Sequence, residues 1–140
     1  MDHRRSCALS PFGEDHIADS ERAIERVIGK RPALYRPPWG WLTPWEGKRL
    51  ARRGYTVVGW DVFTLDWQTP QPPFTEIAAG VRREVQPGSI LLFHDGRTFQ
   101  DRWEAPATIE AVTSLVPALR DDGYRFVTVA ELLKVPAYQR

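Results

Sequence analysis

The sequence has little of what would place it at once in a specialised class of protein. Cys7 is the single cysteine among 140 residues, so an internal disulfide cannot form and the redox compartment is left open. No apolar run approaches the ~20 residues that a membrane-spanning helix needs. The net charge is only +1, which gives no argument for nucleic acid or an acidic membrane surface as a partner. We therefore predict no nucleic acid partner and no membrane span.

The first residues, MDHRRSCALSPF, also lack the pattern of a secretory signal, because no apolar segment follows their positive charges. The sequence leaves the location of the protein open. Tryptophan and proline, in contrast, are abundant, with six and twelve residues, in a composition otherwise typical of a soluble globular domain. Tryptophan often lines sugar or ligand sites, although it also fills cores.

Helical and strand-like segments alternate along the chain. Apolar periodicity and end signals predict helices over about 14–28, 44–54, 74–85 and 105–120, and a closing helical turn over 129–134. The predicted strands are short and apolar, and cover residues 32–36, 55–62, 89–95 and 124–129. Pro117 is expected to shorten or kink the last long helix. Strands separated by helices predict a parallel α/β fold.

Ionisable residues follow three of the predicted strands at the point where each strand ends. Arg36 follows the apolar residues 33–35 of the first strand, Asp61 and Asp66 follow residues 56–60 of the second, and His94 and Asp95 follow residues 90–93 of the third. In parallel α/β folds, the loops at the carboxyl ends of the strands hold the chemistry. We therefore expect these side chains at one edge of the sheet, and this coincidence is the strongest physical signal in the sequence.

His94 has a structural and a functional interpretation. A single histidine after a strand is more often structural, but its position at the same edge as Asp66 favours a general acid or a metal ligand. A carboxylate beside a histidine raises the pKa of the ring and fixes its tautomer. Trp67 either packs into the core or offers a flat wall on which a sugar ring can stack. His16 lies inside the first predicted helix and is expected to be a surface or packing residue.

The stretch LYRPPWGW, residues 34–41, places a cation beside rigid prolines and two large aromatics. This stretch, the pair DW at 66–67 and the run LFH at 92–94 resemble, in this order, motifs of the NodB-like polysaccharide deacetylases, carbohydrate esterase family four. The resemblance covers nearly the whole chain. It implies a distorted, TIM-like parallel (β/α) barrel and a metal-dependent hydrolase that removes acetyl groups from N-acetylated glycans such as chitin or peptidoglycan.

The resemblance also implies a role for each matching residue. Arg36 would orient and charge the catalytic base aspartate, and Trp39 would form one wall of the substrate groove. Asp66 would tune His94, and His94 would be the general acid that protonates the leaving amine. Leu92 would line the acetate pocket. Arg36, Asp66 and His94 are thus the predicted catalytic residues, and Trp39, Trp67 and Leu92 the predicted substrate-binding residues.

Two parts of the family pattern have no counterpart here. The first motif supplies adjacent aspartates after a strand, and the only such pair, Asp121 and Asp122, ends a predicted helix. The second motif is His-x-x-x-His, in which both histidines bind the metal. The phrase LSP at 9–11 often follows the second of these histidines, so His3 is expected to be that metal ligand. An intact parent is expected to bind Zn²⁺ or a similar divalent metal, whereas one histidine does not hold zinc tightly.

We therefore expect one partial deacetylase domain over 1–140, a barrel incomplete at its N-terminal end, and activity near zero in this chain. A wrongly placed start, a deletion, or a genuine short protein with a non-catalytic role each account for this pattern. The exposed edge of such a barrel is expected to favour self-association. The alternative function is a carbohydrate-binding remnant that uses the tryptophans without catalysis.

Overall fold

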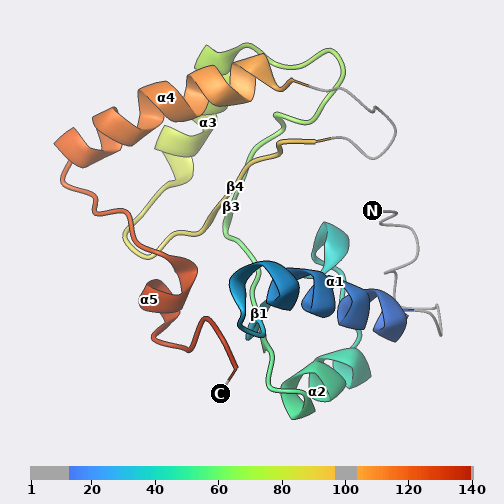
Figure 1. Ribbon diagram of the computed structural model, residues 1–140. Coiled ribbons are helices and arrows are strands. Elements are labelled where there is room, and N and C mark those ends of the chain that lie inside the picture. Colours follow the sequence, from blue (N-terminus) through green and yellow to red (C-terminus); the bar gives the residue numbers. More distant parts are fainter. Residues whose placement is uncertain (1–12, 97–103, 140) are drawn as a thin grey trace. The chain divides into compact units, whose positions relative to one another are not determined.

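The computed structural model describes residues 13–96 and 104–139, which form two compact units (Figure 1). One unit contains residues up to Gly59 together with the segment from Val129 onward, and the other runs from Trp60 to Thr128. Within the described ranges, no helix combines the length and apolar character needed to cross a membrane. The predicted single domain over 1–140 stays a prediction.

The first unit contains two of the predicted helices, α1 over Gly13–Ile28 and α2 over Pro44–Arg52. Helix α2 begins at Pro44 as predicted, and Thr43 is its N-cap. The backbone N–H of Glu46 donates to Thr43 Oγ1, and the backbone N–H of Thr43 donates to Glu46 Oε2 at 2.9 Å. This reciprocal capping box supplies partners for N–H groups at the start of the helix.

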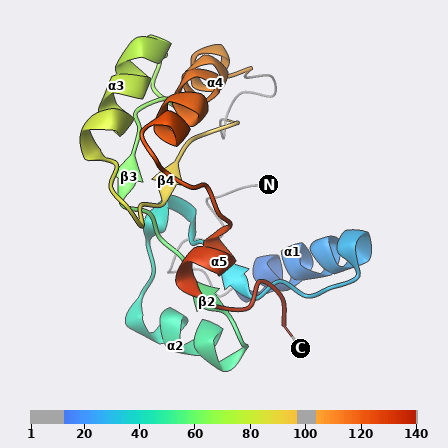
Figure 2. The ribbon, with the colours of Figure 1, turned by 90° about the vertical axis from the view of Figure 1, so that its left-hand side faces the viewer.

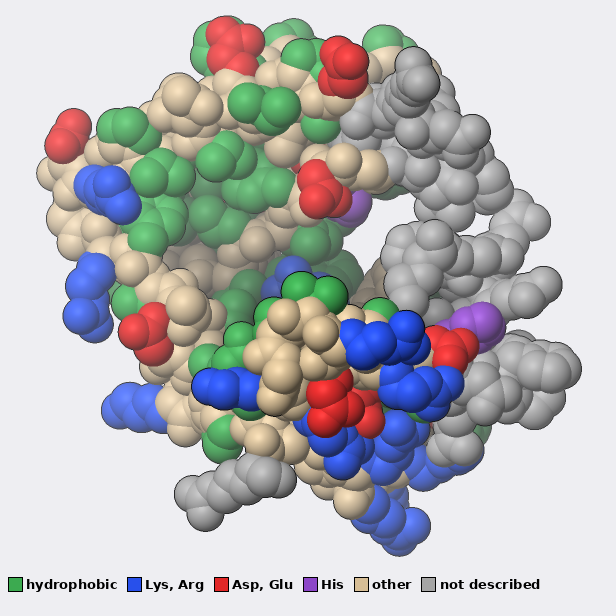
Figure 3. Space-filling model, in the orientation of Figure 1, with side chains coloured by type: hydrophobic (Ala, Val, Ile, Leu, Met, Phe, Trp, Pro, Cys, Tyr) green, Lys and Arg blue, Asp and Glu red, His purple; other side chains and the backbone are tan. Residues whose placement is uncertain are grey.

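A short parallel sheet joins β1, Leu34–Tyr35, to β2, Thr56–Val57. The last residues of the chain return to this sheet, since Pro32 and Tyr138 form an antiparallel bridge after α5, Val129–Leu133. The buried apolar side chains of this unit include Ala33, Leu50, Tyr55 and Val58. Figure 3 shows Lys and Arg side chains gathered over this unit, where α1 and α2 expose several of them.

The second unit packs α3, Phe74–Glu84, against α4, Pro106–Asp121, and the two helices lie side by side in both ribbon views (Figures 1 and 2). A second parallel sheet pairs β3, Val62–Phe63, with β4, Leu91–Leu92. The core of this unit is built from the buried Val62, Val81 and Leu115. One residue from β3 and one from each helix thus meet, which fixes β3 against the helix pair.

The structure corrects two of the strands expected from the sequence. The predicted strand over 55–62 is two short strands, β2 and β3, which belong to separate sheets. The bend lies where Asp61 accepts hydrogen bonds from the Ser89 hydroxyl at 2.7 Å and from the Ile90 backbone N–H. These bonds join the start of β3 to the segment that leads into β4.

The predicted strand over 124–129 is also wrong, because residues 124–128 are neither helix nor strand and Val129 begins α5. Strand propensity needs a pairing partner, and no described strand pairs with this segment. Pro117 does not shorten α4, which continues to Asp121. The strands form two separate parallel pairs, so the fold is α/β with few parallel strands, and a closed barrel is not shown.

Candidate functional site

Asp66 and His94 form a hydrogen-bonded pair within the second unit. The Nδ1 atom of His94 lies 2.8 Å from Asp66 Oδ1, and the backbone N–H of His94 donates to Asp66 Oδ2 at 2.8 Å. The register of the parallel sheet brings Asp66 and His94 together. Phe63 pairs with Leu92, and the segments that follow β3 and β4 leave the sheet in the same direction. The prediction that Asp66 and His94 lie together is confirmed, whereas Asp61, expected at the same edge, precedes β3 and binds the segment that leads into β4.

Asp66 is completely buried, yet protein groups donate hydrogen bonds to both oxygens of its carboxylate. Besides the two bonds from His94, it accepts a bond from the Thr64 hydroxyl at 2.8 Å and one from the Thr108 hydroxyl at 2.9 Å. Burial raises the pKa of Asp66, but the hydrogen bonds from His94, Thr64 and Thr108 together outweigh burial and hold that pKa below its usual value. The group is therefore an ionised, buried carboxylate with four donors.

This charge state determines the form of the His94 ring. An ionised carboxylate only accepts hydrogen bonds, so Nδ1 of His94 carries a hydrogen and donates it to Asp66. In the neutral ring, Nε2 then holds the lone pair, and in the protonated ring it holds the second, transferable proton. The His94 side chain is 30% exposed, so the ring is only partly shielded while Asp66 is closed off.

Two aromatic residues flank the His94 ring. The ring centroid of Phe63 lies 6.3 Å from that of His94 and the ring of Trp67 lies 6.4 Å away, both with edge-on geometry. Trp67 is 44% exposed, so it does not pack into the core as one interpretation of the sequence allowed. Leu92, half-buried on β4, lies two residues before His94. The pair thus lies beside aromatic surface that a ligand can reach.

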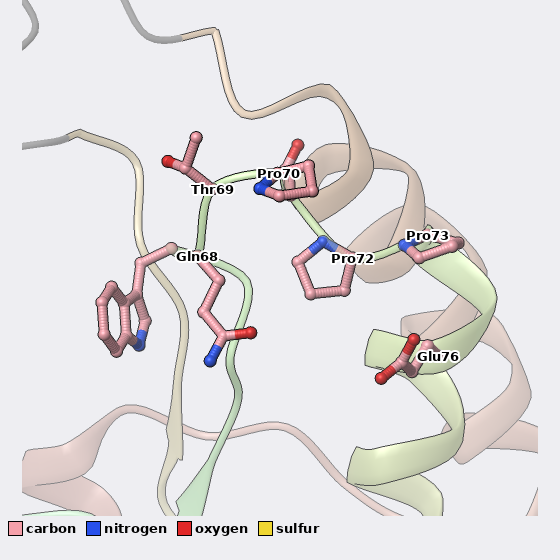
Figure 4. A pocket seen from close by; sticks show the side chains of 8 residues that line it. Gln68, Thr69, Pro70, Pro72, Pro73 and Glu76 are labelled. Atoms are coloured by element: carbon pink, nitrogen blue, oxygen red, sulfur yellow. The ribbon is translucent and has the colours of Figure 1, made fainter.

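The loop that follows Asp66 lines an open pocket of about 640 Å³. Its walls are formed by residues 67–73 and by Glu76 in the first turn of α3. Figure 4 shows the side chains of Gln68 and Pro72 extending to the same side of this loop. The pocket combines an indole, proline rings, amides and one carboxylate, which is a set suited to a polar ligand with apolar faces, such as a sugar.

Arg36, Trp39 and Trp41 lie in the first unit. Arg36 follows β1 and its guanidinium donates to the carbonyl oxygen of Gly59 at 3.1 Å. Trp39 lies in the short 3-10 helix Pro38–Gly40 at φ 54°, a left-handed conformation that is rare for a large side chain, and it is 52% exposed. Trp41 is more exposed still. Arg36 belongs to a different unit from Asp66 and His94, so their predicted meeting stays a prediction.

Sequence reasoning missed the partners that hold Asp66 in place. Thr64 lies two residues before Asp66, and such alternation along an extended segment could have indicated it. Thr108 lies on helix α4, 42 residues after Asp66, and Gln71 lies in the proline-rich loop. No local pattern marks either residue.

Comparison with known proteins gives consistent relatives, although no protein family model matches the chain. A peptidoglycan N-acetylglucosamine deacetylase of Bacillus cereus is 35% identical over 123 residues, which cover 86% of this chain and 54% of that protein. A chitooligosaccharide deacetylase of Bradyrhizobium is 29% identical over 125 residues, covering 84% and 56% of the two chains. The chain thus spans about half the length of these curated relatives.

Solved structures give the same result. A peptidoglycan N-acetylglucosamine deacetylase in complex with a benzamide compound superposes with a TM-score of 0.79 at 26% identity, over 90% of this chain and 56% of that one. A family four pseudoenzyme from Bacillus anthracis gives 0.74 at 26% identity, over 94% and 43%. This chain is a homologue of the polysaccharide deacetylases of carbohydrate esterase family four. A family four acetyl xylan esterase from Clostridium thermocellum, in complex with a cobalt ion, gives 0.69 at 28% identity, over 94% and 63%.

The described part of this family four homologue does not contain a metal site. Among residues 13–96 and 104–139, no group of three or more His, Cys, Asp or Glu side chains could hold a metal ion. His3, the predicted metal ligand, lies outside the described residues. The described residues therefore do not form a metal site by themselves, and Asp66, His94 and their neighbours supply the chemistry of this part of the chain.

Proposed function

We propose that this chain carries the general-acid half of a polysaccharide deacetylase site, which hydrolyses the acetamide group of an N-acetylated glycan. The observation that supports this proposal most is the buried, ionised Asp66, which holds the Nδ1–H of His94. A structural histidine does not need a carboxylate saturated by four donors behind it. A general acid does, because the carboxylate stabilises the imidazolium and fixes which nitrogen transfers the proton.

The proposed reaction consumes one water molecule for each acetyl group. Water adds to the acetamide carbonyl carbon and gives one proton to a base that is not among the described residues. The bond between this carbon and nitrogen then breaks, and acetate and a free amine leave. Protonated His94 supplies its Nε2 proton to the departing nitrogen, which would otherwise leave as a poor amide anion. Asp66 stays ionised throughout and holds the Nδ1–H of His94, so that Nε2 is the nitrogen that transfers the proton. General acid–base catalysis of this kind contributes about 10²–10⁴-fold to the rate.

Peptidoglycan- or chitin-like glycans are the proposed substrates, supported by the names of the curated relatives and by the aromatic surface around His94. Trp67 would stack on a sugar ring, Leu92 would contact the acetyl methyl group, and Trp39 would form a further wall. Arg36 would orient a base aspartate that the described residues do not include. These roles are part of the proposal.

Three further features belong to the proposal in the same way. A divalent metal, with zinc as the expected ion and His3 as one ligand, is proposed for a longer protein with the first two family motifs. A NodB-type distorted barrel is the proposed complete architecture. Self-association through an unpaired strand edge is proposed for this chain alone.

Acetate release from N-acetylglucosamine oligomers, with added zinc, tests the proposed function. The assay should compare this chain with a longer protein that also carries the Asp-Asp and His-x-x-x-His motifs. His94→Gln should lower release by the longer protein about 10²–10⁴-fold, and His16→Gln, on α1, is the matched control. Equal release by the wild-type and His94→Gln proteins would rule out His94 as the acid.

A non-catalytic carbohydrate-binding role is the second proposal. It is supported by the exposed Trp39, Trp41 and Trp67 and by the presence of a pseudoenzyme among the structural relatives. Titration of this chain with chitin or peptidoglycan oligomers should then change its tryptophan fluorescence in a saturable way. The absence of any saturable change at millimolar concentrations of sugar would count against this role.

A further inference from the structure

Gln71 and Thr108 connect Asp66 to the start of helix α4. Gln71 Nε2 lies 3.0 Å from Thr108 Oγ1, which in turn lies 2.9 Å from Asp66 Oδ2. The same nitrogen of Gln71 lies 3.0 Å from the backbone oxygen of Asp66, and Gln71 Oε1 accepts from the backbone N–H of Ala107 at 3.3 Å. Thr108 is buried along with Asp66. These groups form one continuous network inside one unit.

The hydrogens of this network can be arranged in one way only. Because ionised Asp66 only accepts, Thr108 must donate its single hydroxyl hydrogen to Asp66. Thr108 Oγ1 then accepts from Gln71 Nε2, whose two hydrogens serve Thr108 and the Asp66 carbonyl. Gln71 Oε1 is thereby directed at Ala107, whose N–H lies in the first turn of α4 and has no partner within the helix. Every polar atom of the Gln71 amide is engaged.

Gln71 also replaces a missing helix cap. The N-cap of α4 is Ala105, in the left-handed conformation at φ 43°, and it provides no side-chain oxygen for the first-turn N–H groups. Gln71, which lies in a loop 36 positions before Ala107, supplies that oxygen instead. The start of α4, which carries Thr108, is therefore fixed to the loop that carries Gln71 and lines the pocket.

We infer that Thr108 and Gln71 are positioning residues that hold the Asp66 carboxylate and, through it, the His94 ring in the orientation needed for proton transfer. The inference rests on the proposed function for the role of His94. Thr108 binds Asp66 Oδ2 while the His94 ring binds Oδ1, so the hydroxyl fixes the rotation of the carboxylate about its own axis. Gln71 directs the Thr108 hydroxyl and joins it to the pocket loop.

The test measures the pKa of Asp66 by NMR titration of its carboxyl carbon in the 140-residue chain. Thr108→Val keeps the shape of the side chain and removes the hydroxyl, so it should raise this pKa, because the ionised form loses a donor. Thr108→Ser keeps the hydroxyl and should leave the pKa near that of the wild type. Thr113→Val is the matched control, since its hydroxyl lies on the same helix but donates to the Ile109 carbonyl.

Gln71→Met provides a second variant that leaves the sequence of α4 unchanged. It should also raise the pKa of Asp66, but by less than Thr108→Val does. The Thr108 hydroxyl remains and loses only the contact with Gln71 that aligns it with Asp66. If Thr108→Val does not fold, the result with Gln71→Met decides. A pKa of Asp66 that stays at the wild-type value in each folded variant would overturn the inference.

An activity measurement separates this inference from the proposed function. In a protein that releases acetate, Thr108→Val should lower kcat about tenfold with KM unchanged, as expected for one lost hydrogen bond to a charged group, and Thr108→Ser should restore it. If the pKa of Asp66 shifts in the variants as expected but the wild-type protein releases no acetate, the proposed function is refuted and the network stands. Activity that depends on His94 but is indifferent to Thr108 and Gln71, with an unchanged pKa, would refute the inference alone.

Discussion

The hydroxyl of Tyr55 donates a hydrogen bond to the buried carboxylate of Glu21, 34 residues earlier in the chain. The same carboxylate accepts from Arg31 Nη2 at 2.6 Å and Nε at 3.0 Å, and Arg53 lies 3.7 Å away. Glu21 belongs to α1, and Tyr55 directly precedes β2. This cluster therefore fixes the first helix to the parallel sheet of its unit.

We expect Tyr55→Phe to lower the free energy of unfolding by about 1.5–3 kcal/mol, the range for a hydrogen bond to a charged group. The ring keeps its packing, so the loss reports on the hydroxyl. Urea unfolding followed by circular dichroism measures it. Tyr138→Phe is the control, because Tyr138 is 42% exposed and its change should stay within about 0.5 kcal/mol. Equal effects of the two substitutions would contradict a special role for the Tyr55 hydroxyl.

The cluster also predicts how stability depends on pH. Burial raises the pKa of Glu21, but hydrogen bonds from Tyr55 and Arg31 outweigh burial and hold it below its usual value of 4.5. The contribution of Glu21 is therefore present above pH 4.5 and is lost as the pH falls through the lowered pKa of the folded state. Burial and the Glu21 carboxylate raise the pKa of Tyr55 to about 12, so its contribution is present below pH 10 and is lost as the pH rises through about 12.

Unfolding by urea at a series of pH values tests these signs. Glu21→Gln should flatten the fall in stability on the acid side, and Tyr55→Phe should flatten it on the alkaline side. Asp19→Asn is a suitable control for the acid side, because Asp19 pairs with Arg22 on the surface, where an ion pair contributes little. If stability falls at acid pH in Glu21→Gln as steeply as in the wild type, other carboxylates determine this fall.

Trp39 combines an exposed ring with backbone strain. Its φ of 54° is unfavourable for a residue with a Cβ atom by about 1–2 kcal/mol, and glycine adopts this conformation freely. Such strain is typical of residues that a binding site holds in place. We therefore expect Trp39→Gly to leave the free energy of unfolding unchanged or higher, and to weaken binding of N-acetylglucosamine oligomers.

Trp41→Gly is the matched control for this prediction. Trp41 has φ −89°, which any residue adopts, so glycine there should lower stability by roughly 0.5–1 kcal/mol through the greater entropy of the unfolded chain. Thermal unfolding and titration with the oligomers measure the two properties. A Trp39→Gly protein that is less stable than Trp41→Gly would contradict the idea of relieved strain.

The sequence predicted best what is encoded locally. Thr43 and Pro44 mark the start of α2, and the parallel direction of β3 and β4 places Asp66 and His94 together once both strands are recognised. The strand expected over 124–129 failed because local propensity cannot supply a pairing partner. The strand over 55–62 was divided for a related reason, since hydrogen bonds to Asp61 from Ser89 and Ile90 are not visible in the local pattern.

No sequence pattern could have predicted which residues donate hydrogen bonds to Asp66 and hold it in place. Thr108 and Gln71 reach Asp66 from α4 and from the pocket loop, and both are residue types that occur on any surface. Only the fold brings them to a buried carboxylate. A buried charge needs donors, so the correct expectation from Asp66 alone is that such donors exist, without their identity.

The protonation of the His94 ring tests the central claim most directly. The chain holds only three histidines, so the ring nitrogens of His94 can be assigned by comparing ¹⁵N–¹H spectra of the wild type and His94→Gln. At a pH where the ring is neutral, the account predicts that the hydrogen is on Nδ1, bonded to ionised Asp66, and that Nε2 is bare and ready to take up the proton it transfers. A neutral ring with its hydrogen on Nε2 would contradict the account, because Asp66 would then not be the group that orients the acid.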